Sequence, residues 1–357
     1  MTDPQLHTET QVTYLEKGTE HARASDPGPR HGIQHILVCL DGSSSSAICI
    51  AYALSLASTF DSAVTLMHVM QHHDDSFGLH TTNALGWEIT RQEARARLER
   101  LEQEAARVSG RRIGVRLEQG RPAERIAALS TELGADLVVL GSHEENERPC
   151  WELGSTAQQL LAAAHSSVLI ARGRGVPPTF VPPQRILVPL DGSLRTESVL
   201  PTAESIARAH GAQLVLVHVV AEPLPTRILA APEDLQLARD LATRLEAQAT
   251  RYLETLRHHV GYDESLIRTH VDRQADKRQF LVELSARTQI DLIVLSAHGG
   301  RCNLERPCGS VTAHLLTHSK VSLLVLQDVP KSDLQSRGVS DKRRAPPLRG
   351  TYTPEIA

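Results

Sequence analysis

The sequence has few aromatic residues, few cysteines and no long apolar run. Aromatic residues make up only 3% of the 357 residues, so the core must be built from aliphatic side chains, which suits parallel sheets covered by helices. The chain has five cysteines, an odd number, and such a count in a long chain favours a protein with reduced thiols over one held together by disulfides. No apolar run approaches the roughly 20 residues that cross a bilayer, and the polar N-terminus lacks the pattern of a secretory signal. We therefore expect a cytoplasmic protein that has no membrane segment.

The sequence also lacks a strong excess of charge of either sign. The 38 Lys and Arg residues nearly balance the 42 Asp and Glu residues, which gives a formal net charge of −4 at pH 7. This balance argues against a broad electrostatic surface for DNA or RNA, so no nucleic-acid partner is expected. With 41% hydrophobic and 22% charged residues the composition is that of a globular chain, and the length predicts two domains.

The chain contains an internal repeat. Residues 35–70 align without a gap with residues 185–220, and the shared positions include Ile-Leu-Val, Leu-Asp-Gly-Ser and Leu-x-His-Val. Two later pairs of segments match in the same order, which indicates the duplication of one domain. The repeat predicts five parts: a polar N-terminal tail (1–32), a first domain (33–172), a Gly- and Pro-rich linker (173–184), a second domain (185–328) and a basic C-terminal tail (329–357).

Each repeat alternates continuous apolar runs with helical segments. In the first repeat the runs predict strands over 36–40, 64–69, 137–140 and 168–171, and a weaker alternating strand over 113–117. Helical patterns separate these runs, so five parallel strands with right-handed crossovers are expected. The predicted fold is α/β, with two flavodoxin-like, Rossmann-like doubly wound domains, each a five-stranded parallel sheet in the order 3-2-1-4-5. Ligands in such sheets bind at the carboxyl ends of the strands, here between the first and fourth strands.

In this strand order the fifth strand lies at an edge of each sheet. Residues 168–170 and 321–326 are apolar edges, which normally need covering. We expect the two edges to pair within the chain as an intramolecular pseudo-dimer, and a homodimer of two chains is a further expectation.

The loop after the fourth strand contains glycine and ends in a Gly-Ser pair at the start of a helix. Glycine lets the backbone approach a ligand closely, and free N–H groups together with the helix dipole favour phosphate. The alternative is an ordinary loop with a Gly-Ser cap. Asp41 and Asp191 follow the first strands and also have two interpretations. Each can contact a ligand, or each can belong to an ordinary Asp-Gly-Ser turn that leads into the next helix without any ligand.

These segments together resemble the universal stress protein family, and its tandem two-domain type is the closer match. The resemblance rests on Ile-Leu-Val-x-Leu-Asp-Gly-Ser, on Leu-x-His-Val and on the loop after the fourth strand, and it covers about residues 33–328. Nucleotide-binding members of that family carry G-x2-G-x9-G-[S/T] in this loop. The first repeat has Glu144 at the second glycine of the motif, and the second repeat has Ser296 at the first glycine.

The resemblance implies a cytoplasmic stress-response regulator that binds ATP, accompanied by Mg²⁺, without efficient turnover. The ATP-binding residues implied in the second domain follow its first, second and fourth strands: Pro189, Asp191, Val219, Gly299, Gly309, Ser310 and Val311. The matching set in the first domain is Asp41, Val69, Gly141, Gly154, Ser155 and Thr156. Three carboxylates, those of Glu144, Glu145 and Glu147, lie in the loop that would face phosphate in the first domain, so the second domain is favoured.

Other kinds of site find little support in the sequence. The phosphate-loop, dinucleotide-binding and nucleophile-elbow motifs are absent, and no positioned base for hydrolysis is evident. His298, Cys302 and Cys308 fit no standard zinc spacing, so no metal site is predicted. No catalytic residue is predicted either. A redox role for Cys302 and Cys308 would require that their thiols are exposed. Two alternatives to a non-enzymatic ATP-binding protein are a nucleotide-free dimeric scaffold that acts on an unidentified protein partner, and a slow ATPase.

Overall fold

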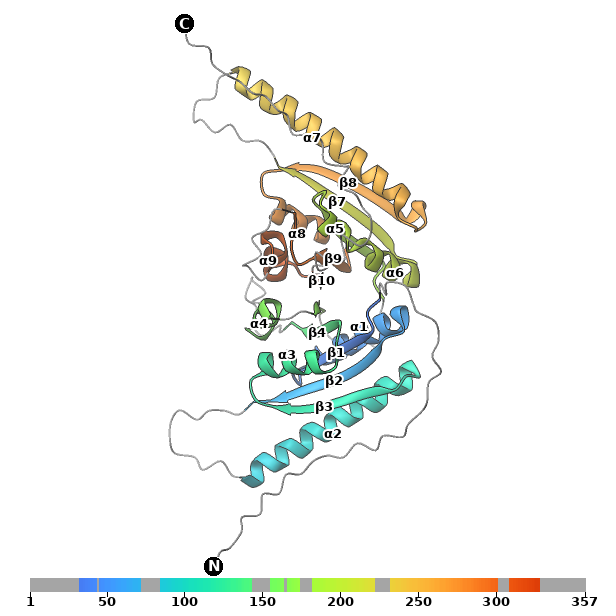
Figure 1. The fold of residues 1–357 in the computed structure, drawn as a ribbon, viewed down its shortest axis with the longest axis vertical. Helices are drawn as coiled ribbons and strands as arrows, with labels where there is room; N and C mark the ends of the chain where they lie inside the picture. Colours follow the sequence, from blue (N-terminus) through green and yellow to red (C-terminus); the bar gives the residue numbers. More distant parts are fainter. Residues whose placement is uncertain are drawn as a thin grey trace, which may run out of the picture. The chain divides into compact units, whose positions relative to one another are not determined.

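Strands and helices alternate along the chain in two series. The computed structural model describes residues 32–43, 45–71, 84–142, 155–163, 166–173, 182–221, 232–300 and 308–327. The first half contains β1 (His35–Leu40), α1 (Ser46–Phe60), β2 (Ala63–Met70), α2 (Ala84–Ser109), β3 (Ile113–Gln119), α3 (Pro122–Glu132), β4 (Leu137–Gly141), α4 (Ser155–Ala163) and β5 (Ser167–Ala171) (Figure 1). The second half contains β6 (Arg185–Leu190), α5 (Leu194–Glu197), α6 (Leu200–His210), β7 (Gln213–Ala221), α7 (Pro232–His259), η1 (Glu264–Leu266), β8 (Ile267–Gln274), α8 (Lys277–Arg287), β9 (Leu292–Ser296), α9 (Ser310–His318) and β10 (Ser322–Leu326). Every strand predicted for the first repeat is present.

The strands form one 10-stranded sheet in the order β3-β2-β1-β4-β5-β10-β9-β6-β7-β8. Within each half the strands are parallel and follow the predicted order 3-2-1-4-5. The α/β class and the two flavodoxin-like halves are therefore confirmed. The difference from the prediction is that the two five-stranded sheets are continuous with each other.

The two halves meet where β5 and β10 pair antiparallel, a contact that we call the seam. Leu169 lies opposite Leu324 at its centre, and both side chains are fully buried. On one side the backbone N–H of Arg172 donates to Ser322 Oγ (3.0 Å), and on the other the N–H of Gln327 donates to Ser167 Oγ (3.3 Å). The seam thus has an approximate local two-fold symmetry, and each apolar edge covers the other.

Arg172 departs from this symmetry. The residue follows β5, its side chain is buried, and its guanidinium donates hydrogen bonds to the carbonyl oxygens of Leu316 and Ser319 at the end of α9. Burial lowers the pKa of Arg172 to about 10, so the group stays charged at neutral pH. A cation there pairs carbonyls that lack intrahelical partners and interacts favourably with the helix dipole. A residue of the first half therefore caps a helix of the second.

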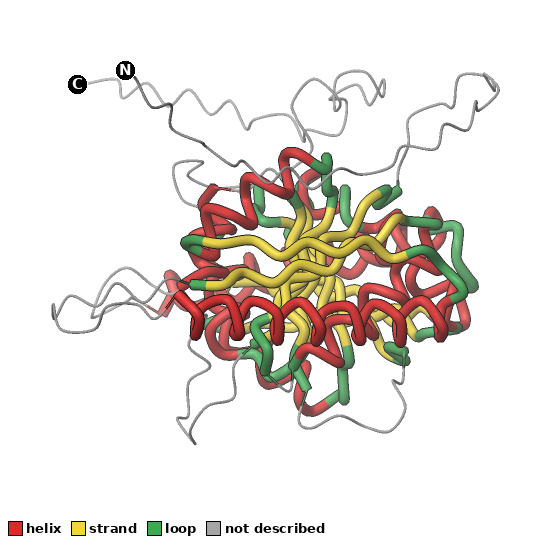
Figure 2. The backbone as a smooth tube through the Cα atoms, turned by 90° about the horizontal axis from the view of Figure 1, so that it is seen from below, coloured by secondary structure: helices red, strands yellow, loops and turns green. Residues whose placement is uncertain are grey.

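Helices cover both faces of the sheet (Figure 2). Successive side chains of β1 point to opposite faces, so that Ile36 and Val38 belong to the core cluster that contains residues of α1, α2, α6 and α7, whereas Leu37 belongs to the cluster that contains residues of α3, α4, α8 and α9. The continuous apolar strands are buried on both sides, as their composition predicts.

The helix that follows the first strand differs between the halves. Where the first half has the single helix α1, the second half has α5 and α6, separated by Ser198 and Val199. Pro201 lies in the first turn of α6 and has no N–H group to continue the hydrogen-bond ladder of α5. The break leaves α5 as a short turn at the end of β6.

Candidate functional site

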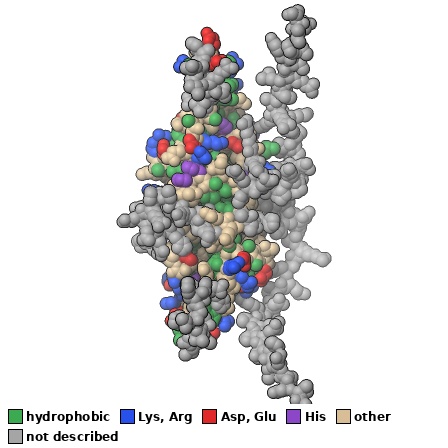
Figure 3. All heavy atoms as spheres, turned by 90° about the vertical axis from the view of Figure 1, so that its left-hand side faces the viewer, with side chains coloured by type: hydrophobic (Ala, Val, Ile, Leu, Met, Phe, Trp, Pro, Cys, Tyr) green, Lys and Arg blue, Asp and Glu red, His purple; other side chains and the backbone are tan. Residues whose placement is uncertain are grey.

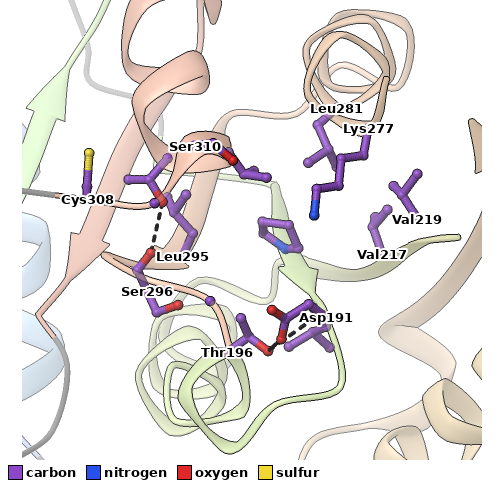
Figure 4. Close-up of a pocket in the computed structure, with 16 residues that line it drawn as sticks. Asp191, Thr196, Val217, Val219, Lys277, Leu281, Leu295, Ser296, Cys308 and Ser310 are labelled. Atoms are coloured by element: carbon purple, nitrogen blue, oxygen red, sulfur yellow. Dashed lines mark hydrogen bonds between the residues drawn. The ribbon is translucent and has the colours of Figure 1, made fainter. Parts of the chain in front are cut away.

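A cavity of about 390 Å³ opens at the carboxyl end of β6, which lies between β9 and β7 in the sheet. The strand order reverses at this point, and doubly wound sheets usually bind their ligands there. The lining (Figure 4) includes every residue predicted for ATP in the second half: Pro189, Asp191, Val219, Gly299, Gly309, Ser310 and Val311. The fold therefore brings together four separate segments of the chain.

Asp191 connects two loops at the mouth of this cavity. Its Oδ1 accepts hydrogen bonds from the backbone N–H of Ser193 (3.0 Å) and from Thr196 Oγ1 (2.9 Å), both on its own side of the mouth. Its Oδ2 accepts the N–H of Gly300 (2.9 Å), which belongs to the loop after β9. Burial acts to raise the pKa of Asp191, but the hydrogen bonds from Ser193, Gly300 and Thr196 outweigh it and hold the pKa below its ordinary value. The ionised carboxylate thus holds the two loops together.

The glycines of the loop after β9 make this contact sterically feasible. A Cβ atom added to Gly299 would lie 2.6 Å from Asp191 Oδ2, and one added to Gly300 would lie 2.7 Å from Ser193 Cβ. Both distances are shorter than real Cβ contacts. The Gly-Gly pair therefore lets the loop close against the residues that follow β6.

We expect the Asp191→Asn variant to be less stable than the wild type at neutral pH, with a difference that shrinks as the pH falls below about 4. The folded-state pKa of Asp191 is lowered, so the ionised carboxylate stabilises the fold above its unfolded-state pKa, and this contribution is lost as the pH falls through the folded-state value. Urea unfolding between pH 7 and pH 3 measures the difference. Asp234→Asn, at an exposed position of α7, is the matched control. A difference that stays constant over this range would contradict the proposed role of the charge.

The start of α9 forms another wall of the cavity. The N–H of Gly309 donates to the carbonyl of Ala297 (2.8 Å), and Thr312 Oγ1 donates to the carbonyl of Ser296 (3.1 Å), so α9 begins directly beside the end of β9. The N-cap residue is Gly309, which has no side chain to pair with the first-turn N–H groups. The positive end of the α9 dipole therefore borders the cavity at Ser310 and Val311, an arrangement that favours an anion.

Sequence reasoning did not identify Lys277, Thr196, Val217 or Leu281, which also line the cavity. In Figure 4 the ammonium group of Lys277 points from α8 into the cavity, and its side chain lies beside Leu281. The repeat contained a usable signal, because α3 and α8 are both 11 residues long and Lys277 stands where α3 has Pro122.

The cysteine and histidine residues of the loop after β9 do not form a reactive cluster in the part of the chain that the structure describes. Cys308 lines the cavity, and burial raises the pKa of its thiol, which keeps it protonated and weakly reactive. His298 is buried, and Cys302 lies outside the described residues. Among the described residues no group of three His, Cys, Asp or Glu side chains could hold a metal ion.

The site predicted in the first half is described only in part. Asp41 Oδ1 accepts the N–H of Ser43 (2.8 Å), and a Cβ atom on Gly141 would collide with Ser45 Oγ, so glycine is needed where β4 meets α1. Val69 lies near the end of β2 and Thr156 in the first turn of α4. Gly154, the side chain of Ser155 and the loop carboxylates of Glu144, Glu145 and Glu147 lie outside the described residues, so this site stays a prediction.

The fold and the cavity define a doubly wound α/β protein built from two repeated halves, with a space for a ligand at the strand ends of the second. The chain belongs to the universal stress protein family, whose sequence profile matches residues 32–172 and 183–327. This match confirms the tandem resemblance inferred from the repeated motifs. The predicted boundaries of the domains, linker and tails stay predictions.

The matches to individual relatives extend over most of the length of each relative. The chain is 25% identical over 299 residues to a universal stress protein of Mycolicibacterium smegmatis, covering 82% of this chain and 96% of that protein. It is 26% identical over 150 residues to a putative universal stress protein of Staphylococcus haemolyticus, covering 42% of this chain and 90% of that protein. The crystal structure of a universal stress protein from Archaeoglobus fulgidus has the same fold, with a TM-score of 0.59 and 17% identity over 82% of this chain and 98% of the other.

Membership in this family supports a role in the stress response. Within the described ranges, none of the helices has the length and apolar character needed to cross a membrane.

Proposed function

We propose that this chain is a cytoplasmic stress-response regulator that binds ATP in the cavity of its second half, without efficient turnover. The observation that carries the proposal is the convergence of all seven predicted residues around one cavity of about 390 Å³ at the switch point of the sheet. That volume lies in the range of roughly 300–1,000 Å³ typical of small-molecule sites.

The chemistry of the lining supports a nucleotide. Pro189, Val217 and Val219 supply an apolar surface on which an adenine ring can pack beside Asp191. Gly309, Ser310 and Val311 border the positive end of α9, where phosphate oxygens can accept backbone N–H groups. Mg²⁺ that accompanies the nucleotide would be held by the phosphates, since no group of metal-ligating side chains is found among the described residues.

The titratable groups of the cavity favour binding over hydrolysis. Among the described lining residues these groups are Asp191, Lys277 and Cys308. Asp191 is a poor general base because its oxygens are engaged by Ser193, Thr196 and Gly300 and its pKa is lowered. Cys308 stays protonated because burial raises its pKa. We therefore infer a ligand-dependent regulator rather than an enzyme.

We expect ATP to raise the melting temperature of the wild-type protein and to have little effect on Gly309→Asp. The new carboxylate would face the phosphates, and like charges at this distance weaken binding by roughly 10-fold to 100-fold. Gly309→Ala is the matched control, because an added Cβ would have its nearest neighbours at 3.6 Å, an ordinary contact, and φ is −67°. Differential scanning fluorimetry and calorimetric titration measure both effects.

Three results would redirect this proposal. Equal binding by the wild type and Gly309→Asp would move the site elsewhere. Absence of nucleotide from the purified protein, together with no thermal shift in ATP, would favour the nucleotide-free scaffold. Phosphate release that Gly309→Asp abolishes would favour the slow ATPase.

A row of exposed leucines on α7 supports the alternative of a nucleotide-free scaffold. Leu237, Leu241 and Leu245 are exposed on α7 at four-residue spacing, and such a row can contact another protein. Association of two chains through any surface stays a prediction. The cytoplasmic location is supported by Cys39, Cys49 and Cys308, which are free thiols within the described residues.

A further inference from the structure

Lys277 places a positive charge in the cavity of the second half. It is the first residue of α8, it lines the cavity, and its ammonium group points inward (Figure 4). The neighbouring cation, Arg278, is paired with Asp276 (3.0 Å) and does not line the cavity. Within the described residues Lys277 itself has no salt-bridge partner. A lysine at a helix start is also unfavourable for the helix dipole, so its position calls for another explanation than helix stability.

The one carboxylate that lines the described part of the cavity does not neutralise Lys277. Asp191 directs its oxygens to Ser193, Thr196 and Gly300, so its hydrogen bonds are made with groups other than Lys277. The start of α9 adds a partial positive charge at Ser310. Besides the hydrogen-bonded Asp191, the described lining therefore offers an anion the charge of Lys277 and the positive end of α9.

The surface near α8 and α9 carries charges of both signs. Figure 3 shows Lys, Arg, Asp, Glu and His side chains mixed on the upper half of the face in view, at the level of α8 and α9. The ion pair of Asp276 with Arg278 belongs to α8, and the stacked rings of His314 and His318 belong to α9. Because both signs are present on this face at the level of α8 and α9, we expect selection for negative charge to depend on groups inside the cavity.

The internal repeat shows that this lysine is particular to the second half. The corresponding first residue of α3 is Pro122, which fits the first turn of a helix and carries no charge. The second half therefore has a charged group where the first half has a residue suited only to starting the helix.

We propose that Lys277 supplies the counter-charge for the phosphates of the ligand and makes this cavity selective for a polyphosphorylated nucleotide over a nucleoside. The inference rests on the proposed function, because it concerns the same cavity. A lysine binds phosphate as a flexible point charge, so it can reach the β- or γ-phosphate while backbone N–H groups of α9 hold another. The charge of the ligand, rather than its base alone, then determines affinity.

The test is calorimetric titration of the full chain with adenosine, AMP, ADP, ATP and inorganic tripolyphosphate. Lys277→Gln is expected to weaken ATP and tripolyphosphate binding about 10-fold or more, to weaken AMP less, and to leave adenosine unchanged. Lys277→Arg, which keeps the charge, should recover much of the ATP affinity. Lys320→Gln removes the same group at an exposed position outside the cavity and should bind like the wild type. Thermal unfolding without ligand checks that each variant folds.

The outcomes separate this inference from the proposed function. An ATP affinity that Lys277→Gln leaves unchanged overturns the inference and leaves ATP binding intact. Equal losses for adenosine and ATP also overturn it, since Lys277 would then contact the base. Binding of tripolyphosphate that depends on Lys277, with no preference for ATP, supports the charge role and contradicts the proposed function. A wild type that binds none of the five compounds overturns both.

Discussion

Leu324→Asp is expected to prevent the full chain from folding, or to lower its free energy of unfolding by about 4 kcal/mol or more. Leu324 is fully buried in the middle of the sheet and lies opposite Leu169, which is also fully buried. A carboxylate there would lose its hydration, and the surrounding aliphatic side chains offer it no hydrogen bond. Because the seam joins the two halves, we expect the damage to affect both halves together.

Urea unfolding followed by circular dichroism measures this effect. Leu237→Asp is the control, because Leu237 is 69% exposed on α7 and the same substitution there should change stability by no more than about 0.5 kcal/mol. Leu324→Met, which nearly preserves the side-chain volume, should cost less than about 1.5 kcal/mol. If Leu324→Asp unfolds at the same urea concentration as Leu237→Asp, the seam is not part of the folded core in solution.

Arg172→Met is expected to lower the free energy of unfolding by about 2–4 kcal/mol. The substitution removes the donors to the carbonyls of Leu316 and Ser319, which would then be buried at the end of α9 without those partners. It also removes the favourable charge at the C-terminus of that helix. The aliphatic part of the methionine side chain keeps most of the packing, so the measured loss reports mainly on the cap.

Gln327 provides a control for the Arg172 variant, because it follows β10 as Arg172 follows β5. Gln327 is only partly buried, and Gln327→Met retains its backbone hydrogen bond to Ser167, so a change below about 1 kcal/mol is expected. Arg172→Lys should have an intermediate effect, since one ammonium group reaches two carbonyls less well than a planar guanidinium. Equal stabilities for Arg172→Met and Gln327→Met would rule out a capping role.

Much of the fold could be predicted because the repeat supplies the same pattern twice. The apolar runs that became β1, β2, β4 and β5 are continuous, which is typical of strands buried on both faces. Pairing of the apolar edges was also expected from the strand order, and β5 does pair with β10. The break between α5 and α6 is a local effect of Pro201 that the motif comparison passed over.

The candidate site was predictable where its residues act through backbone geometry. Gly299 could be identified because a close approach of the backbone to a neighbouring group requires glycine. Gly309 could be identified because glycine is favoured at the start of a helix and lies at a fixed spacing from Gly299. The bond from Gly300 to Asp191 could not, because it joins loops 109 residues apart in the sequence. Lys277 was missed because the direction of a long side chain depends on how α8 packs against β7, which is a tertiary property.

The antiparallel seam has a consequence for how the two halves can be used. Because strand direction reverses between β5 and β10, the carboxyl ends of β1–β5 and of β6–β10 point to opposite rims of the sheet. Ligands bound at the strand ends of the two halves would therefore lie at opposite rims of the sheet, where one would neither block nor touch the other. A duplicated domain in this geometry can therefore lose ligand binding in one half and keep it in the other. A protein that recognised a ligand bound in the cavity of the second half would need to approach the rim formed by the carboxyl ends of β6–β10.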